Sequence, residues 1–405
     1  MSWIKDFISA TSDAEAPDSY FYWAAIAALS GTVANRVWIH KRYYKLYPNM
    51  FIFIISKLSG LGKGVPVAVA KNVMVEAGTA RVITGQLSIQ GVMAELSEAH
   101  TTKTGRIINT AEATLISGEF GALLLNDPKL FTNLTDLYDS QYNEGDWTRR
   151  LRKEQECLRD PCITGLFAAN EVHFREALPF HAVKGGFLGR SICVFESKRR
   201  KLDSLISDDP TEKNKVDPEM SKKLAKHLIK LSEVKGEFDV SHDAAVAYNS
   251  WYHEFYRLDK ELVDDTGTAE RLRDSILKVS MLLSLAEGFT LKIEQRHIEE
   301  ALIHCYQVYK SAVRLVIGEG KSNVATQTKA VLKLILNQNG KKITRQSLLI
   351  RGLQTGDFDS IELDRVIEHL SQTKIVKMSN EGKHTWYSIN MENVNALLKM
   401  EGDEK

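Results

Sequence analysis

The sequence predicts an α/β protein with a mainly parallel sheet, followed by an all-helical region and a small C-terminal domain. Three observations lead to this prediction. Short, continuously apolar segments alternate with helix-like segments up to about residue 200. Residues 220–318 then show nearly unbroken helical periodicity. The last region has three helix-like segments and a stretch that alternates around NEGK, which is typical of a β-hairpin.

The elements of the core follow from their local patterns. Residues 18–35 have apolar residues at helical spacing, with Asp18 or Ser19 as the cap. Residues 37–47 are rich in β-branched and aromatic residues and predict a strand or hairpin. The apolar run 50–56 is typical of a strand buried on both faces. The remaining elements are helices at 65–78 and 88–100, a short strand at 113–117, a mostly helical segment to about 140, and strands at 162–170 and 191–197.

A polar, proline-containing stretch after residue 198 predicts a linker between domains. We therefore expect a core with an N-terminal helix at 1–200, a helical lid domain at 201–320, and a C-terminal domain at 321–405. The last domain is expected to be a winged helix, because three helices at 323–338, 344–353 and 360–373 precede the hairpin.

The composition narrows the class of protein. The chain has 53 basic and 52 acidic residues, which argues against coating nucleic acid by bulk charge but allows a local basic patch. Its four cysteines lack CxxC spacing, which favours reduced thiols over a metal site. The longest apolar run, Met50–Ile55, is far shorter than the ~20 residues that span a bilayer. We expect a soluble, cytoplasmic protein with no membrane partner.

The sharpest motif is SKLSGLGKGVP at 56–66, a glycine-rich turn between a buried strand and a helix. Glycines let successive backbone N–H groups turn toward phosphate oxygens, and the helix N-terminus favours an anion. Lys63 would supply a charge to the β- and γ-phosphates. Against the pattern G-x-x-x-x-G-K-[ST], Lys57 replaces the first glycine and Gly64 replaces the hydroxyl residue that holds Mg²⁺. A turn without a ligand is the alternative; the candidate phosphate-binding residues are Ser59, Gly60, Gly62, Lys63 and Gly64.

Polar residues at later strand ends supply candidate catalytic groups. Glu119 follows the apolar strand in SGEF and could orient or deprotonate an attacking water, although Gly118 stands where an Mg²⁺-linked aspartate is usual. Asn170 ends the strand LFAAN and could position water against a γ-phosphate, or simply begin a turn. Arg190 follows a glycine-rich loop and could reach the nucleotide of a neighbouring subunit, or pair with a surface acid.

The order of these pieces resembles that of the AAA+ ATPases, and among them the helicase-like proteins of phages and mobile elements. The layout is similar to that of minichromosome-maintenance helicases, and the resemblance implies a P-loop NTPase core. Residues 270–288 are similar to their sensor-2 helix, so Arg271, or alternatively Arg273, would contact the γ-phosphate. The resemblance also implies self-association into a ring, expected to be a hexamer, with ATP between subunits. A RecA-like core is the rival fold.

Residues 142–160 lie between the Glu119 and Asn170 strands, where related helicases carry insertions that line a central channel and grip DNA. Cations for phosphates and an aromatic ring for stacking suit such a contact. For residues 142–160 the alternative is a solvated charged loop. The basic cluster 196–201 is expected to be a solvated linker. The predicted recognition helix at 360–373 carries several acids, so the winged helix could instead serve protein contacts or autoregulation. The candidate DNA-binding residues are Trp147, Arg149, Arg150, Arg152 and Lys153.

The leading expectation is an ATP-dependent DNA helicase, translocase or replication ATPase of a phage or mobile element, with ATP as cofactor. Mg²⁺ is the open point, because glycine occupies positions 64 and 118. The alternatives are a nucleotide-binding, weakly or non-hydrolysing replication initiator or loader scaffold, and a winged-helix DNA-binding regulator.

Overall fold

A computed structural model describes most of the chain, and its residues fall into two compact units, 1–314 and 315–405. Each unit is described by itself. The described residues are 2–57, 59–85, 88–120, 130–139, 146–150, 155–177, 186–202, 218–258, 267–320, 323–338, 342–355, 360–382 and 384–390.

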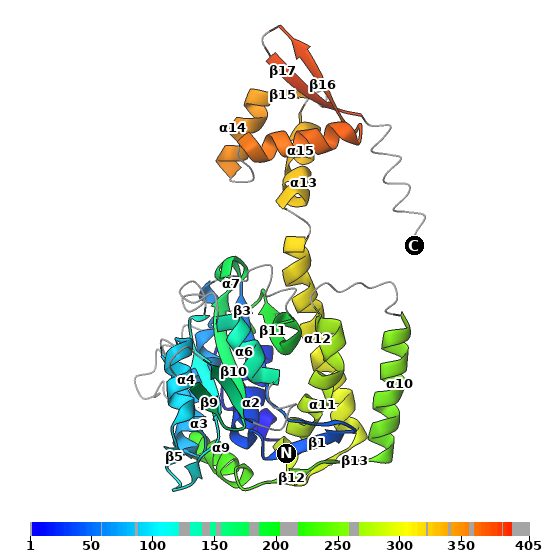
Figure 1. The fold of residues 1–405 in the computed structure, drawn as a ribbon. Helices are drawn as coiled ribbons and strands as arrows, with labels where there is room; N and C mark the ends of the chain where they lie inside the picture. The colour runs from blue at the N-terminus through cyan, green and yellow to red at the C-terminus, as the bar shows by residue number, and fades with distance from the viewer. Residues whose placement is uncertain are drawn as a thin grey trace. The chain divides into compact units, whose positions relative to one another are not determined.

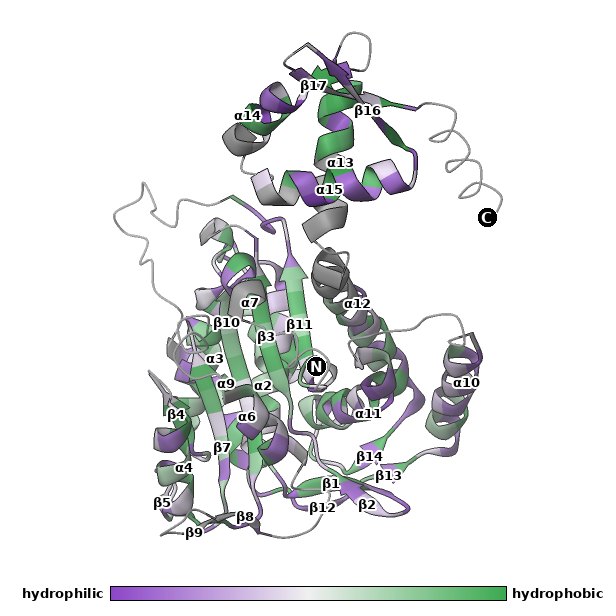
Figure 2. Cartoon of the chain, turned by 45° about the horizontal axis from the view of Figure 1, so that its top comes forward, coloured by the Kyte–Doolittle hydropathy of each residue, from purple (hydrophilic) through white to green (hydrophobic). Residues whose placement is uncertain are grey.

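A five-stranded, all-parallel sheet forms the centre of the first unit (Figure 1). Its residues are mostly apolar, as Figure 2 shows, because helices cover both faces. This confirms the expected α/β core with a parallel sheet. The strands, in spatial order, are β11 (Ser191–Glu196), β3 (Phe51–Ser56), β10 (Cys162–Asn170), β7 (Glu112–Ser117) and β4 (Val82–Thr84).

Side chains alternate between the two faces of β3, as they do in any strand. Ile52 and Ile54 belong to the cluster that includes α2 (Asp18–Val33) and α3 (Gly64–Ala77). Phe51 and Phe53 instead pack among aromatic rings on the opposite face, near α6 (Leu130–Asp139) and α7 (Glu171–Ala177). The rings around Phe53 are those of Phe120, Phe167, Phe174 and Phe187.

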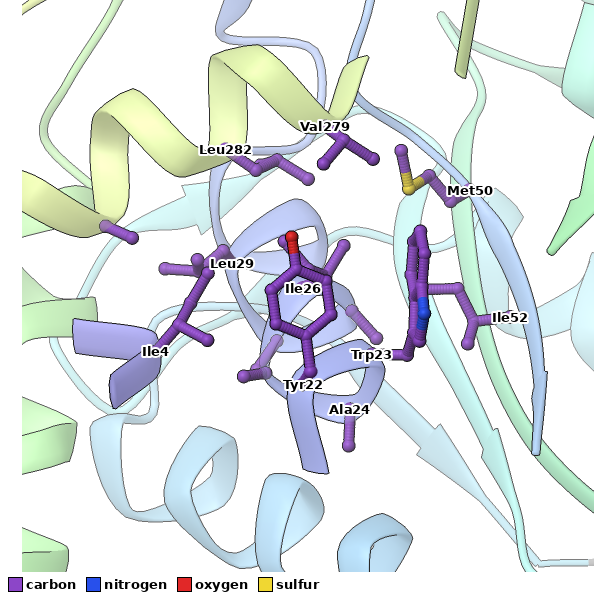
Figure 3. Packing of buried hydrophobic residues seen from close by; sticks show 14 of the residues in the cluster. Ile4, Tyr22, Trp23, Ala24, Ile26, Leu29, Met50, Ile52, Val279 and Leu282 are labelled. Carbon is purple, nitrogen blue, oxygen red and sulfur yellow. The ribbon is translucent and has the colours of Figure 1, made fainter. Parts of the chain in front are cut away.

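Helix α2 is buried on nearly every side, which explains its lack of a polar face. Figure 3 shows Trp23 beside Met50 and Ile52, and Tyr22 directed toward Leu282. Leu282 belongs to α11 (Thr268–Glu287), so α2 is packed between the sheet and a later helix. A Cβ on Gly31 would lie 2.0 Å from Oγ1 of Thr114, so only glycine allows α2 to approach β7 this closely.

The helices between residues 218 and 314 share one hydrophobic cluster with the sheet. Helix α9 (Pro218–Leu231) packs against α3. Lys278 of α11 is buried and donates to the carbonyl and side-chain oxygens of Asn49 and to the Tyr138 hydroxyl. The expected helical lid therefore lies within the same compact unit as the core. The other two helices of this region are α10 (His242–Leu258) and α12 (Gln295–Gly320).

The smaller elements of the first unit lie around this core. Residues 37–47 form an antiparallel pair of β1 (Val37–Lys41) and β2 (Tyr44–Leu46), which confirms the expected hairpin. Helix α1 (Trp3–Ser9) packs on α2, and α4 (Ile89–Ser97) lies between β4 and β7 in the chain. Short strands pair as β5 (His100–Thr101) with β6 (Ile107–Ile108), β12 (Gly236–Glu237) with β1, and β13 (Asp239–Val240) with β14 (Lys292–Ile293).

The second unit has its own apolar cluster, built around Val331, Leu363 and Tyr387. Its three antiparallel strands have the spatial order β15-β17-β16. No helix among the described residues is long and apolar enough to cross a membrane. The elements, in chain order, are α13 (Asn323–Leu336), β15 (Lys342–Thr344), α14 (Arg345–Thr355), α15 (Ser360–Gln372), β16 (Val376–Glu381) and β17 (His384–Ile389).

Candidate functional site

The strand order creates a topological switch point at the carboxyl ends of β3 and β10, where open α/β sheets have a crevice. From β3 the chain runs through α3 to the edge strand β4, whereas from β10 it runs through α7 to the opposite edge strand β11. Helices α3 and α7 pack on opposite faces, so adjacent strands feed helices on different sides. Ligands of open α/β sheets bind at such switch points. The glycine-rich turn and Asn170 both lie there.

The glycine-rich turn leads directly into the first turn of α3. A short 3₁₀ helix, η1 (Ser59–Leu61), precedes Gly62, whose φ of +67° favours glycine. The amide of Val65 donates to the carbonyl of Gly62 at 2.9 Å, and α3 begins at Gly64. The first N–H groups of a helix lack intrahelical partners, so this turn can hold an anion.

Lys63 and Glu119 come together at this crevice. Nζ of Lys63 lies 3.7 Å from Oε1 of Glu119, although the two residues follow different strands. The Lys63 side chain is 11% exposed and that of Glu119 is 70% exposed. The backbone N–H of Glu119 donates to Oγ of Ser117 at 3.4 Å, which holds the Glu119 backbone at the end of β7. The pair offers a sheltered cation and a carboxylate in contact with water.

Asn170 lies at the same edge, in register with Ser56. Its Oδ1 accepts a hydrogen bond from the Val172 N–H at 2.9 Å, so it begins the turn into α7 as the alternative interpretation proposed. Its Nδ2 is a donor at the crevice. Ser56 is fully buried, and its hydroxyl has no hydrogen-bond partner among the described residues.

Gly64 and Gly118 leave open space where a metal-binding side chain is usual. A Cβ built on either glycine meets no described atom within 4 Å. Within the described part of the chain, no group of three or more His, Cys, Asp or Glu side chains is placed to hold a metal ion. Among the described residues, Glu119 could supply a carboxylate oxygen to an Mg²⁺ ion here, alongside phosphate oxygens.

Arg190 lies at the amino ends of the strands, called here the amino edge of the sheet. Lys63 and Glu119 lie at the carboxyl ends, called the carboxyl edge. Arg190 ends η3 (Leu188–Arg190) just before β11, and Ser191 pairs with Phe51 at the start of β3. The six residues of β11 span about 20 Å, farther than an arginine side chain reaches. The Arg190 guanidinium donates to the carbonyl of Gly186 at 2.7 Å. Arg190 therefore cannot contact a phosphate held by Lys63 of its own chain.

Arg271 lies beside Arg190 rather than beside Lys63. A Cβ on Gly189 would lie 3.3 Å from Cγ of Arg271 and 2.6 Å from the carbonyl of Gly267, so η3 packs tightly on the start of α11. Arg273, the alternative residue, hydrogen-bonds to Tyr252 of α10. The two arginines predicted to stabilise charge thus gather at one edge of the sheet.

The segment predicted to contact DNA contains a β-hairpin. Strands β8 (Trp147–Arg150) and β9 (Gln155–Leu158) pair with Trp147 opposite Leu158. At the base, the Ala111 N–H donates to the Arg159 carbonyl at 2.7 Å, which roots the hairpin at the amino edge of the sheet, away from α7 (Figure 2). Arg152, Lys153 and the side chains of Arg149 and Arg150 lie outside the described residues.

The sequence did not indicate that a further basic residue, Arg199, lies beside the glycine-rich turn. Residues 196–201 were expected to be a solvated linker, but Arg199 pairs with Glu15 at 3.0 Å and Arg200 pairs with Asp18 at 2.5 Å. Nη2 of Arg199 lies 2.7 Å from the position of a Cβ on Gly60. No local signal could predict this contact, because it depends on how the chain returns after β11.

The geometry separates two sets of functional groups. Lys63, Glu119 and Asn170 lie at the carboxyl edge, while Arg190, Arg271 and the hairpin lie at the amino edge. The first set suits phosphate binding and activation of water, and the second set faces away from it.

Neither a scan against models of protein families nor a search of curated proteins finds a match for this chain.

Proposed function

We propose that the chain binds ATP at the carboxyl edge of its sheet and works as a subunit of an AAA+-type DNA helicase, translocase or replication ATPase. The observation that carries the proposal is the meeting of Lys63 and Glu119, 3.7 Å apart, beside the glycine-rich turn. A cation, a helix N-terminus and the backbone N–H groups of the glycine-rich turn suit the β- and γ-phosphates. An exposed carboxylate beside them suits the attacking water.

Each residue of the carboxyl edge has a role in this scheme. The amides of the turn and Lys63 bind the phosphates, and Glu119 orients the attacking water and accepts its proton. Asn170 donates from Nδ2 to that water or to the γ-phosphate, while its Oδ1 stays on α7. Glu119 and the phosphate oxygens would hold Mg²⁺, which supplies neutralisation of the developing charge.

The position of the arginines supports a ring. Arg190 and Arg271 lie about 20 Å of strand away from Lys63, so they can complete only a neighbouring chain's site. A repeated contact between the amino edge of one chain and the carboxyl edge of the next is heterologous, and such a contact gives a ring when the rotation between successive subunits closes. The hairpin β8–β9 would then offer Trp147 for base stacking and its arginines for DNA phosphates.

Two observations favour a second candidate, a non-hydrolysing initiator or loader scaffold. Gly64 and Gly118 remove two side chains that usually hold Mg²⁺. The second unit has the helix, strand, helix, helix and hairpin order of a winged helix. The sequence of α15 carries more acids than arginines, and Arg345 pairs with Asp364 at 2.8 Å, so this helix has no excess of cations for DNA. A winged-helix regulator would need its β16–β17 hairpin to make the contact with DNA.

The test is a comparison of ATP binding and Mg²⁺-dependent hydrolysis by the purified full chain, with and without single-stranded DNA. The motor proposal predicts hydrolysis that DNA stimulates, and Lys63→Ala should abolish nucleotide binding while the melting temperature is kept. Binding without hydrolysis under all conditions would favour the scaffold. Unchanged ATP affinity in Lys63→Ala would rule out the phosphate site.

A further inference from the structure

An N-terminal segment lies across the glycine-rich turn. Cβ of Ala16 is 3.5 Å from the position of a Cβ on Gly62. Tyr20 donates its phenol proton to the carbonyl of Ile55 at 2.6 Å, and burial raises the pKa of that phenol well above its ordinary value, so it remains a donor. The Ser19 hydroxyl donates to Glu196 at the end of β11, at 2.8 Å. Residues 14–20 thus form a strap fixed to the carboxyl ends of two strands.

Arg200 fastens this strap from the other side. Its Nε donates to the carbonyl of Ala14 at 2.7 Å, and its backbone N–H donates to the carbonyl of Glu15 at 3.2 Å. The guanidinium carbon lies 4.9 Å from the centre of the Phe21 ring. The side chain is only 14% exposed, so Arg200 has a structural role.

Arg199 has a different environment from its neighbour. Its Nη1 donates to Oε2 of Glu15 at 3.0 Å, while its Nη2 stands over Gly60, 2.7 Å from where a Cβ would be. The side chain is 36% exposed. A side chain at position 60 would displace the guanidinium, so the glycine leaves room for Arg199 beside the turn. A planar guanidinium with one edge anchored and the other over a glycine turn is placed to bind a phosphate.

We propose that Arg199 is a second phosphate-binding cation of this site, acting on the nucleoside di- or triphosphate bound by its own chain. The proposal rests on the nucleotide site proposed above. Glu15 pairs only with Nη1, whereas Nη2 lies at Gly60, and the ion pair contributes little by itself because it is partly exposed. Arg199 differs from Arg190 and Arg271 in that a single chain suffices for its contact.

The experiment compares two variants that break the same ion pair. Arg199→Ala removes the cation, whereas Glu15→Ala removes only its partner. Fluorescent ATP and ADP analogues are titrated into the full chain at fixed ionic strength. Arg199→Ala should weaken both nucleotides by about 10- to 100-fold, the worth of a charge-assisted hydrogen bond. Glu15→Ala should stay within about fivefold of the parent chain, and Arg199→Lys should lie between them.

The outcomes separate the two proposals. Equal losses in Arg199→Ala and Glu15→Ala would show that the pair only ties the strap, and this inference would fail. If Lys63→Ala abolishes binding while Arg199→Ala leaves it unchanged, only the role of Arg199 fails. If neither variant changes binding, the nucleotide site itself fails. Melting temperatures of all variants show whether a loss reflects unfolding.

Discussion

The Lys63 ammonium lies 3.7 Å from the Glu119 carboxylate, but the lysine is sheltered and the glutamate is largely exposed. The cation is therefore fixed by the protein, while the carboxylate can turn toward solvent. A phosphate that enters the turn would compete with Glu119 for the same ammonium. The Glu119 carboxylate is thus placed both to act on the attacking water, as proposed above, and to oppose the binding of an anion to Lys63.

Replacing Glu119 with Gln should separate these two effects. ATP affinity should rise several-fold, because the competing negative charge is gone. Turnover should fall by about 10²- to 10⁴-fold, the usual contribution of a general base. Equilibrium titration and steady-state hydrolysis measure the two quantities. A loss of affinity in Glu119→Gln would contradict the competition.

Gly64→Ser and Gly118→Asp test the open positions in the site. Both side chains fit, since a Cβ at either glycine meets no described atom within 4 Å. The double variant should make nucleotide affinity depend more steeply on Mg²⁺ concentration than in the parent chain, because an oxygen ligand has been restored at each position. Titration of ATP at several Mg²⁺ concentrations measures the change, and Gly64→Ala with Gly118→Ala is the matched control.

Two inactive variants that lack complementary halves of the proposed site should regain ATP hydrolysis when they are mixed. Arg190→Ala should bind ATP normally but lose about 10³- to 10⁵-fold in turnover, as expected for an arginine supplied in trans. Lys63→Ala should be inactive because its own turn is defective. A mixture of the two should regain activity, since Lys63→Ala can lend its arginines to its neighbour. Impaired ATP binding by Arg190→Ala would contradict this assignment.

Cys157 offers a reporter for the hairpin. It is exposed on β9, whereas Cys162, Cys193 and Cys305 are buried. Burial raises the pKa of the Cys162 and Cys193 thiols to about 12, so at pH 8 one thiol per native chain should react with a disulfide reagent. Cys157→Ser should remove that reaction, and single-stranded DNA should slow it if the hairpin contacts DNA. An unchanged rate at saturating DNA would place the contact elsewhere.

The same thiols give a pH dependence of stability. Their pKa in the folded chain lies above the ordinary value of 9.0, so the folded state holds protons that the unfolded state loses. Their contribution is complete below pH 9 and is lost as the pH rises toward 12. Urea unfolding from pH 8 to 11 measures this loss.

Gly31→Ala should destabilise the first unit. The added methyl would meet Oγ1 of Thr114 at 2.0 Å, and overpacking of this kind costs about 1–3 kcal/mol. Thr114→Ala in the same chain should recover part of the loss. Gly64→Ala, where space is open, is the control and should leave the urea midpoint unchanged or slightly raised. Equal effects at positions 31 and 64 would contradict the packing explanation.

Local patterns were sufficient for most elements of the fold. The run MFIFII indicated a buried strand because alternating Phe and Ile side chains face two apolar layers, and β3 occupies Phe51–Ser56. The strand expected at 162–170 is β10, with the same bounds. The hairpin around NEGK was predictable because both of its strands and its turn are contiguous in the chain.

Contacts between distant segments were not predictable in the same way. The strand expected to begin at 113 begins at Glu112, a buried acid tolerated because Arg36 and Arg106 donate to it at 3.0 and 2.8 Å. The pairing of Gly236 with Val37 also depends on tertiary packing. So does the position of Arg199 over Gly60, which no spacing in the sequence indicates.

The placement of Lys63 and Arg190 at opposite ends of the sheet has a consequence for how the protein would be assayed. In the proposed ring, a solitary chain would carry halves of two reaction centres and no complete one. Specific activity should therefore fall on dilution, at concentrations where ATP is still bound. A small proportion of copies that carry both Lys63→Ala and Arg190→Ala should inhibit an assembly more than their number suggests, because each would spoil the sites on both of its flanks.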